Sequence, residues 1–248
     1  MKRRGHRPSQ APASRPRFYG RHAVLAALAN PERIVRKIWG TREALAALDL
    51  PPVIPITFAD VSDLARLIPG DAPHQGLVAE VEPLEDVWLG DLIEQGLGDR
   101  RPLVVLDQIT DPHNLGAILR SAAAFDALGI VTQDRHSPPE SGTVARAASG
   151  ALETVPWVRV VNLARALDEI GEAEFWRIGL TGHAKGTLAQ VMGEGRIALV
   201  LGAEGEGMRH NTEAHCDELA RLPIGPKVES LNVSNAAAIA LYAVSVRG

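Results

Sequence analysis

The chain has 248 residues, of which 46% are hydrophobic and 4% aromatic, so it can form one large domain or two small ones with a mainly aliphatic core. A single cysteine, Cys216, excludes an intrachain disulfide, and no apolar run approaches the roughly 20 residues of a membrane-spanning helix. Residues 1–17 lack the apolar stretch of a signal peptide. We therefore expect a cytoplasmic protein without membrane association.

Charge is distributed unevenly along the chain. Residues 1–21 contain seven basic and no acidic side chains, and because the whole chain carries −4, the remainder carries −11. A basic segment on an acidic body favours contact with nucleic acid, although a solubilising leader has the same composition. The prolines and serines of residues 1–17 predict a basic, disordered tail.

Helices and strands alternate in the first part of the chain. The pattern predicts a helix over 19–30, a strand over 34–39, a helix over 42–48, a strand over 53–57, a helix over 60–68 and a strand over 76–81. This alternation predicts a small α/β domain over residues 18–82. Residues 83–101 are rich in acids and glycine, which predicts a linker with room for one short helix.

A more regular alternation starts at Pro102. The apolar run over 103–106 is typical of a buried parallel strand. Further strands are predicted at 129–131, 155–161, 175–180, 197–201 and 219–224, and helices at 115–128, 143–150, 162–170 and 232–246. This order predicts an open, mostly parallel sheet with helices on both faces over residues 102–248.

Polar, glycine-rich loops follow several of these strands, at 107–114, 181–185, 202–207 and 224–232. Ligands of open parallel sheets bind at the carboxyl ends of the strands, so these loops are the candidate site. The loop over 202–207 lacks the lysine of a P-loop and the spacing of a dinucleotide fingerprint, which disfavours a nucleotide-dependent oxidoreductase. Its two carboxylates suit an adenosine or sulfonium ligand, and a plain glycine turn is the alternative.

Two segments allow both a functional and a structural interpretation. Arg120 lies in an otherwise apolar helix, so it either reaches the strand-end cleft, facing an RNA phosphate or an oxyanion, or forms a buried ion pair. Residues 230–235 place hydroxyls and amides at a helix start, where they cap the helix or hold a ribose. The histidines have no recognised metal-ligand spacing, so no metal site is predicted.

Three ordered motifs, over 107–120, 199–208 and 222–235, together resemble those of the SpoU/TrmH family of RNA ribose 2′-O-methyltransferases, and most closely the bacterial 23S rRNA guanosine enzymes. The likeness extends from Phe18 to the C-terminus and is looser over 19–24 and 74–76. It implies a knotted (trefoil) SPOUT methyltransferase domain behind a small ribosomal-protein-like α/β RNA-binding domain. It also implies a homodimer with active sites near the interface.

The same resemblance assigns a cofactor, S-adenosylmethionine, and site residues. The cofactor contacts that it implies are Thr181, Gly182, Gly202, Leu222, Ile224 and Leu231. The catalytic residues that it implies are Asn114, Arg120, Glu204, Ser230 and Asn232. Proposals for the family make the arginine the base, but a guanidinium stays protonated, so we expect this side chain to stabilise the forming alkoxide.

The predicted function is therefore S-adenosylmethionine-dependent 2′-O-methylation of a guanosine ribose in large-subunit rRNA. A tRNA ribose is the main alternative substrate, and the additional N-terminal domain favours rRNA. A non-catalytic RNA-binding or ribosome-assembly protein is a second alternative. The presence of the motif residues, among them Glu204 and Asn232, disfavours that alternative.

Overall fold

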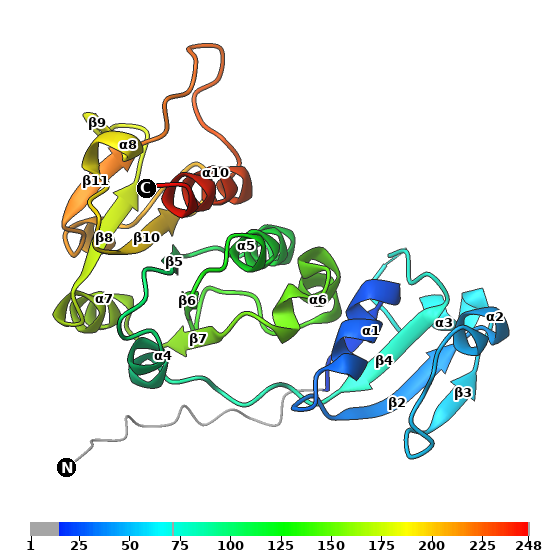
Figure 1. The fold of residues 1–248 in the computed structure, drawn as a ribbon. Coiled ribbons are helices and arrows are strands. Elements are labelled where there is room, and N and C mark those ends of the chain that lie inside the picture. The colour runs from blue at the N-terminus through cyan, green and yellow to red at the C-terminus, as the bar shows by residue number, and fades with distance from the viewer. Residues whose placement is uncertain (1–14, 71, 248) are drawn as a thin grey trace.

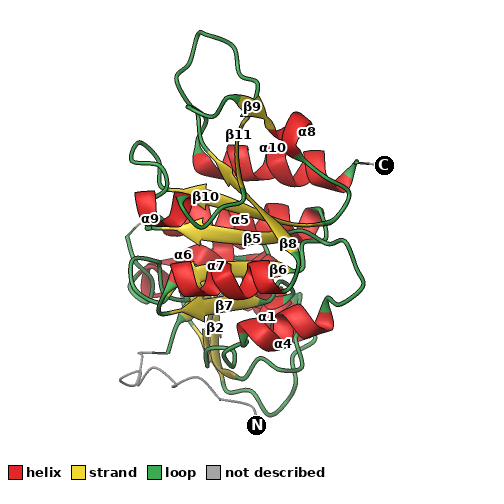
Figure 2. Ribbon diagram, turned by 90° about the vertical axis from the view of Figure 1, so that its left-hand side faces the viewer, coloured by secondary structure: helices red, strands yellow, loops and turns green. Residues whose placement is uncertain are grey.

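A computed structural model describes residues 15–70 and 72–247, so most of the predicted basic tail, residues 1–14, lies outside the described part of the chain. Two β-sheets with surrounding helices make up the fold (Figure 1, Figure 2). The N-terminal sheet has the order β1-β4-β2-β3 and the second sheet the order β7-β6-β5-β10-β8-β11-β9. Among the described residues, no helix combines the length and apolar character needed to cross a membrane.

The N-terminal sheet is mixed. Its strands are β1 (Arg17–Tyr19), β2 (Val35–Gly40), β3 (Ile56–Phe58) and β4 (Leu77–Val81), and its helices are α1 (Arg21–Ala29), α2 (Arg42–Ala46) and α3 (Val61–Ala65). Strand β4 pairs antiparallel with β1 and β2, while β2 and β3 are parallel. The strand predicted at 53–57 begins only at Ile56, because a turn precedes it. The turn starts at Pro51, whose carbonyl accepts a hydrogen bond from Ile54 N (3.1 Å).

The second sheet is parallel throughout, which confirms the predicted α/β class. Its strands are β5 (Leu103–Asp107), β6 (Gly129–Gln133), β7 (Trp157–Val160), β8 (Phe175–Leu180), β9 (Gly186–Thr187), β10 (Arg196–Gly202) and β11 (Glu218–Arg221). Its helices are α4 (Leu89–Gln95), α5 (Pro112–Ala124), α6 (Gly142–Ala148), α7 (Leu163–Glu172), α8 (Leu188–Val191), α9 (His210–Glu213) and α10 (Val233–Ser245), with a 3₁₀ turn at Ala151–Glu153. The trefoil knot implied by the resemblance stays a prediction.

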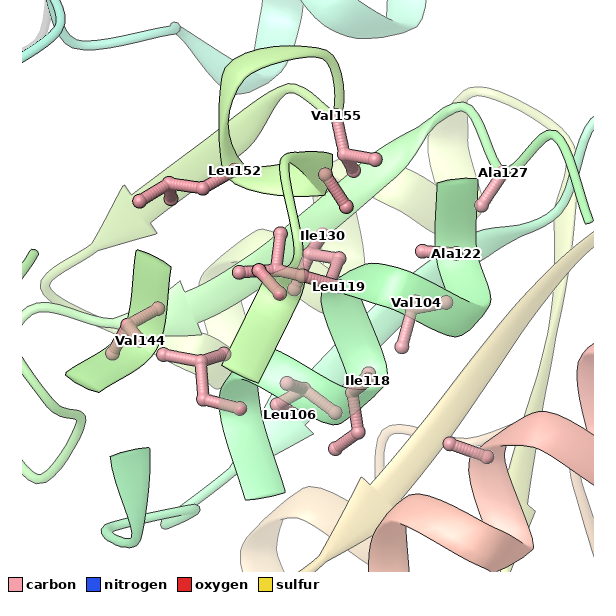
Figure 3. Packing of buried hydrophobic residues seen from close by; sticks show 14 of the residues in the cluster. Val104, Leu106, Ile118, Leu119, Ala122, Ala127, Ile130, Val144, Leu152 and Val155 are labelled. Atoms are coloured by element: carbon pink, nitrogen blue, oxygen red, sulfur yellow. The ribbon is translucent and has the colours of Figure 1, made fainter. Parts of the chain in front are cut away.

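Successive side chains of β5 enter two different cores. Val104 and Leu106 pack with α5, α6 and α10, whereas Leu103 and Val105 pack with α4 and α7. The residues of a strand point alternately to the two faces of its sheet, so a strand covered on both faces must be apolar throughout. Figure 3 shows the first of these cores around Val104, Leu106 and Ile118.

The first core continues into the N-terminal sheet. It includes Phe18, Val24 and Ile38 together with Val144 and Ala145 of α6, so the two sheets share buried apolar surface. Figure 1 shows α1 and α6 side by side between the two sheets. This packing holds the two parts of the chain together without relying on the connecting segment alone.

The segment over 83–101, predicted as a linker, contains α4. Leu89, Leu92 and Ile93 of this helix are buried against the second sheet. Part of the segment therefore belongs to the packing of the parallel sheet, and the domain boundaries stay a prediction.

Candidate functional site

Three of the predicted motif residues meet at the carboxyl ends of neighbouring strands. Asn114 lies in the first turn of α5 after β5, Glu204 in the loop after β10, and Asn232 at the start of α10. Strands β5 and β10 are paired, so the loops after them emerge side by side. The sequence-based expectation that these motifs converge at one edge of the sheet is met in this geometry.

One carboxylate oxygen organises this cluster. Glu204 Oε1 accepts a short hydrogen bond from Asn232 Nδ2, a second from Val233 N (3.1 Å), and a third from Asn114 Nδ2 (3.5 Å). Asn232 Nδ2 also donates to Asn114 Oδ1 (3.0 Å). The acidic side chain thus ties the second motif to the first and the third, and it accepts from the N-terminus of α10, where a negative charge is favourable.

The loop that carries Glu204 depends on glycine at particular positions. A Cβ at Gly202 would lie 2.1 Å from Met208 N and from the carbonyl carbon of Gly207, so only glycine fits there. Gly205 and Gly207 have φ of 80° and 72°, the left-handed region that favours glycine. Two backbone hydrogen bonds between Ala203 and Gly207 (2.9 and 3.1 Å) close the turn and present Glu204 to the cluster.

A buried carboxylate that the sequence did not reveal anchors the far end of this loop. Asp107, with 0% exposure at the end of β5, accepts from Arg209 N (2.9 Å) and Arg209 Nε (2.9 Å). Arg209 Nη2 donates in turn to Gln133 at the end of β6 (3.0 Å). The only signal in the sequence was an aspartate that closes a fully apolar strand.

Helix capping is the interpretation that the structure supports for residues 232–235. Asn232 Oδ1 accepts from Ser234 N (2.9 Å) and Asn235 N (3.4 Å), as an N-cap does. Ser230, by contrast, is exposed, and its hydroxyl forms no hydrogen bond with any described residue. Of the two predicted catalytic residues in this motif, one is built into the cluster and the other is available to a ligand.

The structure excludes one of the two sequence interpretations of Arg120 and leaves the other a prediction. It is exposed on α5 and forms no ion pair or hydrogen bond with the described residues, so a buried ion pair is wrong. Six residues of α-helix separate it from Asn114, which corresponds to roughly 9 Å along the axis and about 120° around it. The side chain of Arg120 therefore leaves α5 in a different direction from that of Asn114, and its role toward an RNA phosphate or an oxyanion stays a prediction.

The predicted cofactor residues line the same edge of the sheet. Thr181 follows β8, Gly202 ends β10, Leu222 follows β11, and Leu231 precedes α10. Thr181 N donates to Ala220 O (2.9 Å), which holds the ends of β8 and β11 together. The strand order β10-β8-β11 makes these positions neighbours.

The long loop between β11 and α10 leaves its backbone free. Residues 223–230 are exposed, and the loop projects from the body of the molecule (orange in Figure 1). Ile224 N donates to Leu222 O (2.9 Å), but the backbone groups of 225–230 form no hydrogen bond with another described residue. Free amides and carbonyls beside a carboxylate fit a nucleoside ligand with a positive charge.

Other chemistry at this end of the molecule is disfavoured by the surroundings of its candidates. Burial raises the pKa of Cys216 to about 12, so its thiol is a poor nucleophile. Among the described residues, no three His, Cys, Asp or Glu side chains are grouped to hold a metal ion. A cavity of about 470 Å³ lies at the opposite ends of the strands, beside Phe175 and Arg196, and does not overlap the cluster.

Comparison with known families and proteins agrees with this geometry. The SpoU rRNA Methylase family matches residues 101–242, and the RNA 2′-O ribose methyltransferase substrate binding family matches residues 18–87. The 23S rRNA (guanosine-2′-O-)-methyltransferase RlmB of Salmonella typhi is 43% identical over 236 residues, which cover 91% of this chain and 96% of that protein. RlmB of Escherichia coli K12 is 41% identical over 234 residues, with the same coverages.

Further relatives extend the comparison. An uncharacterised tRNA/rRNA methyltransferase of Synechocystis is 42% identical over 236 residues, and these cover 92% of this chain but only 61% of that protein. The SpoU methyltransferase AviRb of Streptomyces viridochromogenes was solved in complex with AdoMet. It superposes on this chain with a TM-score of 0.79 and 22% sequence identity, and the superposition covers 94% of this chain and 90% of the AviRb chain. A putative TrmH-family RNA methyltransferase of Porphyromonas gingivalis superposes with a TM-score of 0.73 at 25% identity, over 93% and 89%.

The superpositions confirm the SPOUT fold that the resemblance implied. The family match spans more than half of the chain, and the two RlmB proteins match it at more than 40% identity over nearly their whole length. The chain belongs to the SpoU rRNA methylase family.

Proposed function

We propose that this protein transfers a methyl group from S-adenosylmethionine to the ribose 2′-oxygen of a guanosine in 23S rRNA. The observation that carries the proposal is the hydrogen-bonded cluster of Asn114, Glu204 and Asn232, which unites three motifs at the carboxyl ends of β5, β10 and β11. The names of the RlmB relatives support the choice of substrate, and AdoMet in AviRb supports the choice of cofactor.

The cofactor site is assigned to the ends of β8, β10 and β11. Thr181, Gly182 and Gly202 form one wall, and the backbone from Leu222 through Ile224 to Leu231 forms the other. When bound, the cofactor supplies a methyl group on a positively charged sulfur, which is the electrophile. The open surroundings of Gly182 leave room for a ligand to approach the backbone closely, whereas the space beside Gly202 is occupied by the backbone of Gly207 and Met208.

The protein residues have separate roles in this proposal. Glu204 and Asn232 hold the loops of the second and third motifs in place, and Asn114 joins them to α5. Ser230, whose hydroxyl is free, binds the ribose. Arg120 stabilises the alkoxide that forms as the 2′-hydroxyl loses its proton to a neighbouring phosphate, because a guanidinium is a poor base but a good partner for an oxyanion.

A homodimer is part of the same proposal. Ile239, Tyr242 and Val246 of the C-terminal segment are 45%, 55% and 58% exposed, and Tyr242 meets Phe125 at the end of α5 edge to face (5.9 Å between ring centroids). An exposed apolar face of this kind is best covered by a second copy of the chain. Tyr242→Glu should produce monomers in light scattering and lower the rate of methyl transfer. A wild-type chain that is monomeric at micromolar concentration contradicts the dimer.

Methyl transfer from labelled S-adenosylmethionine tests the proposed function. Unmodified 23S rRNA and unmodified tRNA are supplied separately, and nuclease digestion locates the label. Label in 2′-O-methylguanosine of 23S rRNA is the expected result, and it fits a protein that works in the cytoplasm. Label in tRNA alone overturns the substrate, whereas absence of both label and cofactor binding favours a non-catalytic RNA-binding protein.

A further inference from the structure

Two short segments in the N-terminal part of the chain, 19–24 and 74–76, also resemble the SpoU/TrmH family. They contribute nothing to the cluster around Glu204, yet the fold brings them together. Gly20 N donates to His74 O (3.2 Å) and to Leu77 O (3.3 Å). Arg21 N donates to Gln75 Oε1 (2.9 Å), so the glutamine side chain closes the start of α1. Because these contacts join segments more than 50 residues apart, they build one local structure out of both matches.

This structure forms one side of a cavity at the seam between the two sheets. The cavity has a volume of about 150 Å³ and is lined by Tyr19, Gly20, His22, Ala23, Gln75, Arg146 and Ser149. The first five residues come from the N-terminal domain, and the last two come from α6 and its C-cap in the catalytic domain. The seam is fixed on both sides, since Tyr19 Oη bonds Thr143 Oγ1 (3.0 Å) and Arg146 donates a short hydrogen bond to Pro73 O.

The lining favours an anion. Arg146 carries a positive charge, and only one hydrogen bond of its guanidinium, to Pro73 O, is formed with the described residues. His22, the free amide nitrogen of Gln75 and the hydroxyl of Ser149 add donors, and none of the lining residues is a carboxylate. The first turn of α1, which has no acidic residue, lines the same cavity and adds its dipole.

Size limits the anion to a small one. Pockets that enclose a drug-sized or nucleotide ligand have volumes of about 300–1,000 Å³, so a cavity of about 150 Å³ holds a phosphate group but not a nucleoside. Phosphates of a nucleic acid are the anions that a domain for binding RNA encounters in excess.

We propose that this seam cavity binds one phosphate of the substrate RNA backbone, gripped at once by Gln75 and His22 of the N-terminal domain and by Arg146 of the catalytic domain. The assignment rests on the proposed function, which makes RNA the substrate. A phosphate held from both sides positions the RNA relative to both domains, so the contact orients the substrate in addition to attracting it.

Binding of unmodified 23S rRNA to Arg146→Gln as a function of salt tests the proposal. Loss of one phosphate contact should reduce the slope of log K against log salt by about 0.7–0.9 and weaken binding about fivefold to tenfold at 0.1 M salt. The KM for rRNA should rise with kcat and cofactor affinity unchanged. Arg165→Gln, on the exposed side of α7 and also losing one positive charge, is the matched control and should leave the slope unchanged.

Two further variants separate recognition from folding. Arg146→Lys keeps the charge and should keep most of the salt slope. His22→Ala leaves the Arg146 contact to Pro73 in place while removing a donor, and it should weaken rRNA binding without disturbing the seam. A lowered melting temperature of Arg146→Gln with an unchanged salt slope shows that the side chain only holds the seam, and it overturns the proposal.

Inorganic phosphate distinguishes the source of the anion. At equal ionic strength, phosphate should compete with rRNA more strongly than chloride does for the wild type but not for Arg146→Gln. Suppose instead that phosphate raises the melting temperature of the wild type while the wild type and Arg146→Gln have the same slope of log K for rRNA binding against log salt. In that case the cavity binds a free anion, and the assignment to RNA is wrong. Failure of the wild type to bind or methylate any RNA instead contradicts the proposed function itself.

Discussion

Arg120 is the predicted catalytic residue whose role can be tested most directly, because it stands apart from the structural cluster. It has no partner among the described residues, so changing it should not disturb folding. Arg120→Lys keeps the positive charge but loses the planar, two-pronged donor. We expect kcat to fall about 10²- to 10³-fold, as when an oxyanion donor is removed, with the dissociation constant for S-adenosylmethionine unchanged in calorimetry.

A lysine enzyme that keeps most of the wild-type rate contradicts this geometric role. It would show that any cation at position 120 suffices, and so that the residue attracts RNA in general. Arg165→Lys on α7 provides the matched control, since that side chain is also exposed and lies on the other face of the sheet.

Asp217 gives a residue-scale prediction about pH. Hydrogen bonds from Arg177, led by its guanidinium (2.6 and 2.8 Å), hold the pKa of this carboxyl below its usual 3.8. A lowered folded pKa means that the stabilisation is complete above the unfolded value and is lost as pH falls through the folded one. Asp217→Asn should therefore cost about 1–2 kcal/mol of unfolding free energy at neutral pH.

Urea unfolding at several pH values checks the direction. The difference between wild type and Asp217→Asn should be constant from neutral pH down to about the usual aspartate pKa of 3.8 and narrow only below it. A difference that widens as pH falls contradicts the assigned shift. Asp168→Asn is a suitable control, because that exposed carboxylate approaches Arg177 and His215 at only 4.0 and 3.8 Å and accepts no hydrogen bond from Arg177.

Single residues of the site could be predicted to different extents. Asn114, Glu204 and Asn232 could be placed together because parallel strands deliver the loops after them to one edge. The pairing of Asp107 with Arg209 could not, since Arg209 lies outside the three motifs and only the fold brings it to the end of β5. The sequence could not decide whether Arg120 is exposed or ion-paired, because the rotation of α5 about its axis is set by packing.

At the scale of elements, α10 links stability to the site through its cap. Asn232 caps α10 and also belongs to the cluster, whereas Asn162 caps α7, where its Oδ1 accepts from Arg165 N (3.2 Å), and has no contact with the cluster. Asn232→Ala and Asn162→Ala should each lower the free energy of unfolding by about 0.5–2 kcal/mol, because each removes a helix cap. Only Asn232→Ala should also lower methyl transfer, because it frees Glu204 from its short hydrogen bond.

Chemical denaturation and the methyl-transfer assay on the same two variants separate the effects. Equal losses of activity in Asn162→Ala and Asn232→Ala would show that general stability limits the enzyme and that the cap of α10 has no special role. A loss confined to Asn232→Ala, measured well below the melting temperature of both variants, supports the role of the cluster.

Elements with strong local signals were predictable from the sequence. The helices predicted to begin at residues 60 and 162 and the apolar strand predicted over 103–106 are present, and Asp60 and Asn162 cap the two helices. The short β1, β9, α8 and α9 were missed, since two to four residues carry no periodicity and such elements are defined by their neighbours. Residues 53–55 belong to the strand predicted over 53–57, but the prolines on either side of Val53 and Ile54 favour a turn.

At the scale of the whole molecule, a buried ionic cluster joins the N-terminal part of the chain to the part that contains the parallel sheet. The side chain of Arg33 is 0% exposed and contacts Glu153 (2.9 Å) and Glu140, both of which lie in the second part. Asn30 Nδ2 adds a hydrogen bond to Glu153 (2.8 Å), and the guanidinium also donates to Glu82 O (2.7 Å). More than 100 residues separate Arg33 from Glu140 and Glu153 along the chain, so no local pattern could predict this cluster.

The two glutamates of this cluster should respond differently to neutralisation. Glu153 makes two-pronged contact with Arg33, and removing its charge leaves a buried cation poorly compensated, which should cost about 3–5 kcal/mol. Glu140 is different, because burial raises its pKa above the usual 4.5 despite the nearby guanidinium. A raised carboxyl pKa means that the folded state binds the proton more tightly, so stability falls as pH rises from 4.5 through the folded value.

Glu140→Gln removes that titration. As pH rises from 4.5 through the folded pKa of Glu140, the Glu140→Gln protein should therefore gain stability relative to the wild type. Glu153→Gln should be less stable than the wild type both below and above this pH range. Calorimetric unfolding over this pH range measures the stability of both variants. It also shows whether the two parts of the chain melt in separate transitions in Glu153→Gln, in which the ionic cluster that they share is weakened. If the free energy of unfolding of Glu140→Gln instead falls relative to the wild type as pH rises, the attraction of Arg33 for the Glu140 carboxylate outweighs the cost of burying it. Both glutamates would then stabilise the contact between the two parts of the chain through their negative charges.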